Sequence, residues 1–160
     1  MGDALRDLEH ESRRKMTETQ EQYGETTHLS FFVSGIPLAQ GRPRFKRVGK
    51  FTKTYDPAES KSWKESVRWQ FIEQMHKENR SMIEGVIEAD LVFLLPRPKS
   101  LPKKTKYHVK KPDLDNLVKS VFDALQGIAF HSDSQIYKMT VTKLYENKIP
   151  GVSIILRRID

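Results

Sequence analysis

Residues 110–125 read KKPDLDNLVKSVFDAL, and they predict an amphipathic helix whose two leading aspartates come directly after two lysines. The apolar side chains recur with helical spacing and form one face, made of Leu114, Leu117, Val118, Val121 and Leu125. Asp113 follows Pro112 and is well placed as the N-cap. Asp115 lies in the first turn, where a carboxylate suits the helix dipole and can pair with Lys119. Helix capping therefore accounts fully for Asp113, and it is compatible with Asp115.

A metal site is the alternative interpretation of the acidic pair. A third carboxylate, Asp133, follows in a polar loop at residues 131–135, after one helix of about four turns. If the next strand runs back along the helix, this loop could return near the helix start. Three converging carboxylates need a cation between them, and Mg²⁺ binds oxygen ligands of this kind while it keeps several waters. Carboxylates that hold Mg²⁺ among lysines fit phosphodiester hydrolysis.

The composition is that of a soluble globular protein with a heavily charged surface. The chain has 160 residues, of which 37% are hydrophobic and 31% are charged, so one domain with a real core is expected. The absence of cysteine excludes disulfides and thiolate metal sites, and it fits a reducing cytoplasm. No apolar run approaches the roughly 20 residues that span a bilayer. We therefore expect a cytoplasmic protein without a membrane partner.

The net charge of +7 is unevenly distributed along the chain. Residues 1–28 hold four basic and seven acidic side chains, a balance of −3, so the remainder of the chain carries +10. A segment with this much positive charge attracts polyanions. Nucleic acid is the first candidate partner and an anionic membrane surface is the second, whereas solubility alone is the simplest reading of the charge.

The order of predicted elements indicates an α+β fold. Strands are expected at residues 29–36 and 85–98, and residues 139–146 and 151–159 read as a hairpin. A first helix opens at Asp56-Pro57 and buries a stripe of Trp63, Val67, Phe71 and Met75. We predict two main helices packed on a mixed four- to five-stranded sheet in a single domain, residues 29–160. The polar residues 1–28 are expected to form a helical or mobile N-terminal extension.

Two proline-punctuated basic segments are the candidate nucleic-acid contacts. The first, residues 37–55, interleaves aromatic residues with positive charge and should be a loop or a mobile hairpin. This mixture suits phosphate contact with base or sugar stacking, but it equally suits a solvated loop whose aromatics cover the core. The second, residues 97–112, delivers the chain to the acidic pair. The predicted DNA-binding residues are Arg42, Arg44, Lys46, Arg47, Lys110 and Lys111.

The motifs of the chain together resemble the RusA family of Holliday junction resolvases, which are endodeoxyribonucleases of bacteria and their phages. The resemblance covers about residues 30–158, and its order and spacing are specific. It is carried by PDLDNLVK at 112–119, FDAL at 122–125 followed by Gly127-Ile128, DSQI at 133–136, and the upstream PLAQGRPRF at 37–45.

The resemblance implies a homodimeric, Mg²⁺-dependent enzyme that resolves four-way DNA junctions by paired symmetric nicks in recombination and repair. The choice between Mg²⁺ and Mn²⁺ stays open. By position, Asp113, Asp115 and Asp133 would be the metal ligands. Lys119 would be the essential lysine, and Asn116 would support the carboxylates.

The chain departs from the family pattern at two positions. Pro112 stands where relatives can carry an arginine, so that Lys110 and Lys111 would have to supply that phosphate contact. Ser132 precedes Asp133, where relatives often have a second aspartate. Two other functions stay open: a non-catalytic basic nucleic-acid-binding protein, and a less selective structure-specific nuclease with the same metal site.

Overall fold

The computed structural model describes residues 28–41, 44–55 and 57–159, and it describes β2 and β3 by their backbone alone. Its elements in chain order are β1 (His28–Ser34), β2 (Arg44–Val48), β3 (Phe51–Tyr55), α2 (Ala58–Lys77), β4 (Val86–Pro96), α3 (Leu114–Leu125), the 3-10 turn η1 (Asp133–Gln135), β5 (Ile136–Glu146) and β6 (Gly151–Ile159). The predicted N-terminal extension lies outside the described residues, apart from its last residue, His28, which begins β1.

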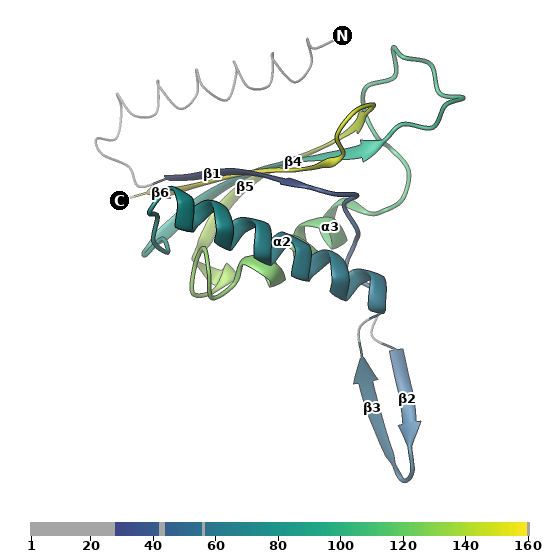
Figure 1. Ribbon diagram of the computed structural model, residues 1–160, viewed down its shortest axis with the longest axis vertical. Helices are drawn as coiled ribbons and strands as arrows, with labels where there is room; N and C mark the ends of the chain where they lie inside the picture. The colour runs from purple at the N-terminus through teal and green to yellow at the C-terminus, as the bar shows by residue number, and fades with distance from the viewer. Residues whose placement is uncertain (1–27, 42–43, 56, 160) are drawn as a thin grey trace.

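Four strands form one mixed sheet in the order β1-β6-β4-β5. The pairs β1–β6 and β4–β6 are antiparallel, whereas β4 and β5 are parallel. Both long helices, α2 and α3, pack on the same face of this sheet (Figure 1). The predicted α+β class, with two helices on a mixed four-stranded sheet, is confirmed.

The predicted hairpin between residues 139–146 and 151–159 is wrong, because β5 and β6 are separated by β4. The burial of the two strands gives the physical reason. Most of β6 is buried, so it gains most from the central position between β1 and β4. None of the residues of β5 is fully buried, which suits an edge strand. The connection at residues 147–150 therefore carries the chain across β4.

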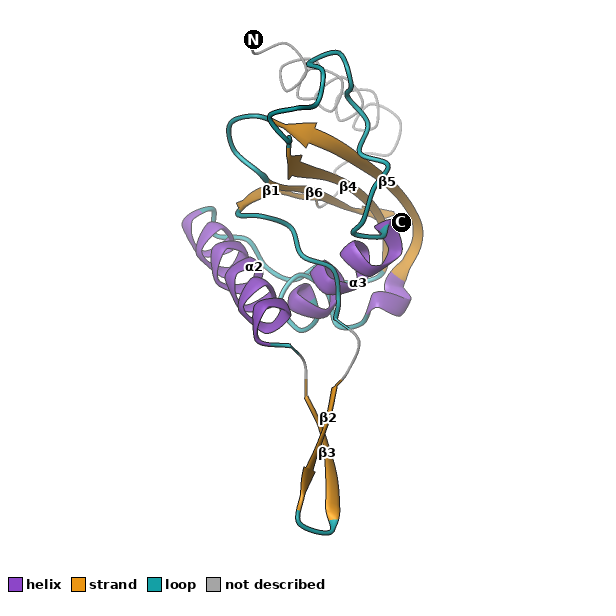
Figure 2. Cartoon of the chain, turned by 90° about the vertical axis from the view of Figure 1, so that its right-hand side faces the viewer, coloured by secondary structure: helices purple, strands orange, loops and turns teal. Residues whose placement is uncertain are grey.

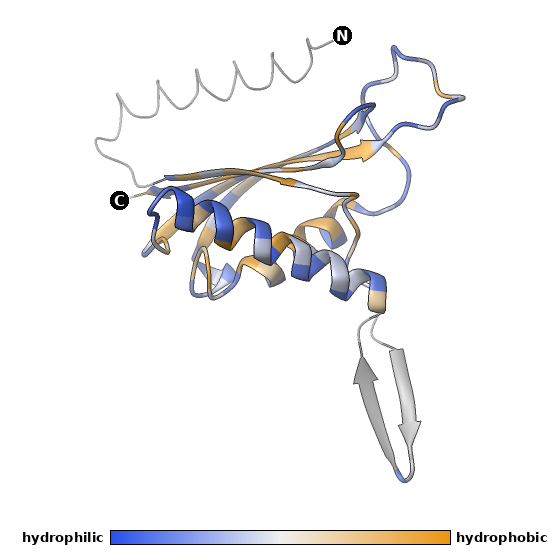
Figure 3. Ribbon diagram, viewed as in Figure 1, coloured by the Kyte–Doolittle hydropathy of each residue, from blue (hydrophilic) through white to orange (hydrophobic). Residues whose placement is uncertain are grey.

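The core lies between the helices and the sheet. The predicted stripe of α2 is buried throughout, and within it the Phe71 ring meets the Phe31 ring of β1 edge-to-face at 4.6 Å. On α3, Leu117 is fully buried, a contribution of about 1.5–3 kcal/mol for such a side chain, whereas Leu114 is 38% exposed. Figure 3 shows hydrophobic residues along α3 and in the strands of the sheet, and a largely hydrophilic loop between β4 and α3.

The outer edge of β1 is covered by side chains of α2. The Nε2 of Gln70 donates to the carbonyl oxygen of Ser34 at 2.8 Å, and the Ser34 N–H donates to the Gln70 Oε1 at 3.0 Å. One turn on, the Nε2 of Gln74 donates to the Phe32 carbonyl oxygen at 2.9 Å. These bonds satisfy backbone groups that an edge strand would otherwise expose to another chain.

The predicted hairpin within residues 37–55 is present as the antiparallel pair β2–β3, with Arg44 opposite Tyr55 and Val48 opposite Phe51. It projects away from the sheet, beyond the N-terminal end of α2 (Figures 1 and 2). Within the part of the chain that the structure describes, no helix is long and apolar enough to cross a membrane.

Candidate active site

The acidic pair lies at the N-terminal end of α3, as the sequence predicts. Asp113 occupies the N-cap position with extended backbone angles, yet its side chain accepts no hydrogen bond from the helix. Asp115 follows in the first turn. Both side chains are exposed, and among the described residues neither carboxylate has a hydrogen-bond or ion-pair partner. The predicted ion pair between Asp115 and Lys119 is therefore not formed. Within the part of the chain that the structure describes, capping and local ion pairing therefore do not account for this pair.

The acidic pair also lies at an end of the sheet where ligands commonly bind. Because β4 and β5 are parallel, the intervening α3 runs in the opposite direction, and its N-terminus lies near the carboxyl ends of both strands. Figure 2 shows this βαβ unit, with α3 beside β5. Ligands of open sheets with parallel strands commonly bind outside those carboxyl ends.

Lys143 of β5 holds the segment that leads into the acidic pair, and the sequence analysis missed it. Its Nζ donates to the carbonyl oxygen of Lys110 at 2.7 Å and to that of Pro112 at 2.6 Å. Its own carbonyl oxygen accepts from the His108 N–H at 3.0 Å. One sequence signal could have found it: Lys143 continues the face of Met139 and Val141, where the period-two pattern expects an apolar residue.

The exit of β1 reaches the first turn of α3 from the other side. The Gln40 N–H donates to the Asn116 carbonyl oxygen at 2.9 Å. The segment that leads to the β2–β3 hairpin therefore starts beside the acidic pair. Of the predicted DNA-binding residues in this region, Arg42 lies outside the described residues. The side chains of Arg44, Lys46 and Arg47 on β2 lie outside them as well.

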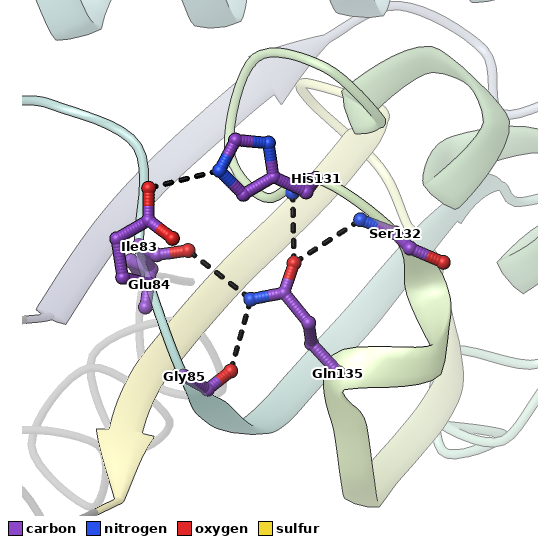
Figure 4. Close-up of polar contacts among 6 residues, drawn as sticks. All are labelled: Ile83, Glu84, Gly85, His131, Ser132 and Gln135. Atoms are coloured by element: carbon purple, nitrogen blue, oxygen red, sulfur yellow. Dashed lines mark hydrogen bonds and ion pairs between the residues drawn. The ribbon is translucent and has the colours of Figure 1, made fainter.

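The turn that carries Asp133 is anchored at the start of β4 (Figure 4). The Gln135 Oε1 accepts from the backbone N–H groups of His131 and Ser132, at 2.8 and 3.1 Å. The Gln135 Nε2 donates to the Gly85 carbonyl oxygen at 2.9 Å and, more weakly, to that of Ile83 at 3.3 Å. The side chains of His131 and Glu84 add an ion pair at 2.9 Å when the histidine is protonated.

This anchoring places Asp133 beyond the C-terminal end of α3, whereas Asp113 and Asp115 are at its N-terminal end. The 12-residue helix is about 18 Å long. Strand β5 does run back along the helix, but the residue that it brings to the helix start is Lys143. Among the described residues, no three His, Asp or Glu side chains lie close enough together to hold a metal ion. The convergence of three carboxylates is therefore absent within a single chain, and a role for Asp133 stays a prediction.

His108 lies half-buried next to this site. Its ring lies against the Tyr145 ring, with the centroids 4.5 Å apart and the planes tilted by 44°. The Arg97 guanidinium lies 5.4 Å from the centroid of the same Tyr145 ring. Burial, helped by the charges of Lys143 and Lys110, lowers the pKa of His108 below its usual 6.5. The lowered pKa favours the neutral imidazole, which makes His108 a weaker phosphate contact.

These features define an α+β protein with an exposed acidic site in basic surroundings. The chain belongs to the RusA family, because the family model for Endodeoxyribonuclease RusA matches residues 34–157. Membership of this family implies that the protein is a nuclease.

Two curated relatives match nearly their full lengths. The uncharacterized protein YqaN of Bacillus subtilis (strain 168) is 35% identical over 143 residues, which cover 82% of this chain and 97% of the relative. The crossover junction endodeoxyribonuclease RusA of Aquifex aeolicus (strain VF5) is 22% identical over 134 residues, which cover 83% of this chain and 94% of the relative.

Proposed function

We propose that this nuclease resolves four-way DNA junctions by paired symmetric nicks, in recombination and repair. The observation that carries the proposal is the exposed pair Asp113 and Asp115 at the start of α3, next to Lys110 and Lys111, which has no hydrogen-bond or ion-pair partner among the described residues. The name of the Aquifex relative supports junctions as the substrate.

The acidic pair fits a hard divalent cation. Ionised carboxylates only accept hydrogen bonds, and among the described residues no donor satisfies these two. Oxygen ligands of this kind suit Mg²⁺, and Mn²⁺ as well. When bound, such a cation would activate water and neutralise the charge that develops on the phosphate.

The basic residues around the pair have separate roles in this proposal. Lys119 is exposed one turn beyond Asp115, where its ammonium can act as a point charge on the attacked phosphate or the leaving oxygen. Lys110 and Lys111 are exposed directly before the pair and would hold the neighbouring backbone phosphates. Asn116, in the first turn, would orient the carboxylates.

A homodimer would explain why Asp133 is remote from the pair within one chain. If a two-fold axis sets the α3 helices of two copies antiparallel, the N-terminal end of each helix faces the C-terminal end of the other. The partner subunit's Asp133 would then approach Asp113 and Asp115. A four-way junction has two equivalent strand exchanges, and a two-fold protein presents one site to each.

The test is incubation with a synthetic four-way junction, with and without Mg²⁺, while the nicks on all strands are mapped. We expect metal-dependent nicks at symmetric positions on two opposing strands, and much slower cleavage of a linear duplex of the same sequence. Equal rates on the linear duplex would favour the less selective nuclease. Tight junction binding without cleavage in any divalent metal would favour the binding protein.

A further inference from the structure

Lys143 connects the edge of the sheet to the backbone that precedes the acidic pair. Its Nζ lies 2.7 and 2.6 Å from the carbonyl oxygens of Lys110 and Pro112. Hydrogen bonds from a charged donor are shorter and stronger than neutral ones, and these two are short. Pro112 directly precedes Asp113, and its carbonyl group belongs to the peptide bond that joins the two residues. The second hydrogen bond therefore fixes the orientation of this peptide bond, directly before the acidic pair.

Among the described residues, Lys143 is the source of the hydrogen bonds that join this segment directly to the sheet. The pairing of the loop with β5 stops at His108, whose N–H donates to the Lys143 carbonyl oxygen, and helical bonding starts when the Leu117 N–H donates to the Asp113 carbonyl oxygen. Between them, the direct hydrogen bonds from the sheet to residues 109–112, within the described part of the chain, are the two that the Lys143 ammonium donates. The His108 ring, which lies against Tyr145 of β5, also contacts the Lys110 backbone.

We propose that Lys143 is a positioning residue for the nuclease reaction, which sets the place of Asp113 and Asp115 through the carbonyl groups of Lys110 and Pro112. This inference rests on the function proposed above. Lys143 lies in register with Phe93, a fully buried residue of the central strand β4, so its stem starts from a rigid part of the sheet. A displacement of about 1 Å at a reacting group can cost about a hundredfold in rate, so a fixed anchor matters.

Three variants separate positioning from charge. Lys143→Met keeps the length of the side chain but removes every donor, and Lys143→Arg keeps donors that can reach both carbonyl groups. Lys138→Met is the matched control, because it removes the same charge from the same strand. The Lys138 ammonium lies 2.8 Å from the Glu88 carboxylate, and the Lys138 side chain is 57% exposed whereas that of Glu88 is 17% exposed. Lys138 is near the start of β5, about 17 Å along the strand from Lys143, and therefore away from the loop.

The first measurement is hydrogen exchange of the metal-free protein, which needs neither metal nor substrate. The His108 and Tyr145 amides, which bond between the loop and β5, should exchange at least about tenfold faster in Lys143→Met than in Lys138→Met. The second is Mn²⁺ titration by electron paramagnetic resonance, where the dissociation constant should rise about tenfold. The third is junction cleavage, where kcat should fall about 10- to 100-fold while KM matches that of Lys138→Met.

Lys143→Arg should recover most of each change, which a loss of folding could not produce. The proposal is overturned if Lys143→Met exchanges and binds Mn²⁺ like the wild type, or if Lys138→Met shows the same losses. The proposed function fails separately, if the wild-type protein neither binds Mn²⁺ nor cleaves the junction. In that case the exchange data still show whether Lys143 anchors the loop.

Discussion

Gln135 donates a 2.9 Å hydrogen bond from its side-chain Nε2 to the Gly85 carbonyl oxygen, and this bond joins the turn that carries Asp133 to the start of β4. The same side chain accepts two backbone N–H groups of its own turn. A single amide therefore fixes both the shape of the turn and its place on the sheet.

Gln135→Leu should loosen this turn at nearly constant side-chain size. We expect the free energy of unfolding to fall by about 1–3 kcal/mol, because several hydrogen bonds are lost together. Junction cleavage should fall about tenfold, since Asp133 loses its fixed position. Urea unfolding and single-turnover cleavage measure the two effects. Gln126→Leu, at an exposed position of the same connection, is the control and should change neither quantity.

Asp113→Asn should abolish metal-dependent cleavage while DNA binding persists or tightens. The amide is a far weaker cation ligand than the carboxylate, so we expect a loss of at least about a hundredfold in cleavage rate. Removing a negative charge also lessens the repulsion of phosphate. Asp123→Asn, at an exposed position on the same helix, is the matched control. Comparable loss in both variants, measured on one junction at saturating Mg²⁺, would contradict a specific role for Asp113.

If the protein is the homodimer proposed above, mixed dimers test whether Asp133 acts across the subunit boundary. Asp113→Asn and Asp133→Asn homodimers should both be inactive. If each site takes Asp133 from the partner, a mixed dimer of the two variants contains one site with both carboxylates intact, and it should nick one strand. If each site uses its own Asp133, both sites of the mixed dimer carry one substitution, and no cleavage returns. Differently tagged subunits, purified in tandem, provide the sample.

The stability of the fold should fall in mild acid partly through His108. Because the pKa of His108 is lowered in the folded state, the unfolded state binds the proton more readily. The contribution of His108 to the free energy of unfolding is therefore complete above about pH 6.5, and it is lost as the pH falls through the pKa of His108 in the folded state. His108→Phe keeps an aromatic ring against Tyr145 and removes the titrating group. Thermal unfolding at pH 7.5 and 5.5 should show a smaller difference for the variant, and equal differences would count against this assignment.

Local features of the chain were predictable because their causes are local. The stripe of α2 and the buried face of α3 follow from helical periodicity, and Asp113 and Asp115 are neighbours at one helix end whatever the rest of the chain does. Helical spacing also predicted Leu114 as part of the buried face, yet it is 38% exposed, because periodicity does not show how far the sheet extends beneath the first turn.

The sequence by itself determined the α+β class, the two helices and the acidic pair between basic segments. Only the tertiary structure decided that β6 enters the sheet between β1 and β4. It also decided that Lys143 hydrogen-bonds to the loop before α3, and that Asp133 lies at the opposite end of that helix from the acidic pair. Hydrogen bonding and periodicity within a helix depend on residues three or four positions apart. Strand order and the ends at which loops emerge depend instead on which apolar faces bury best together across the whole chain.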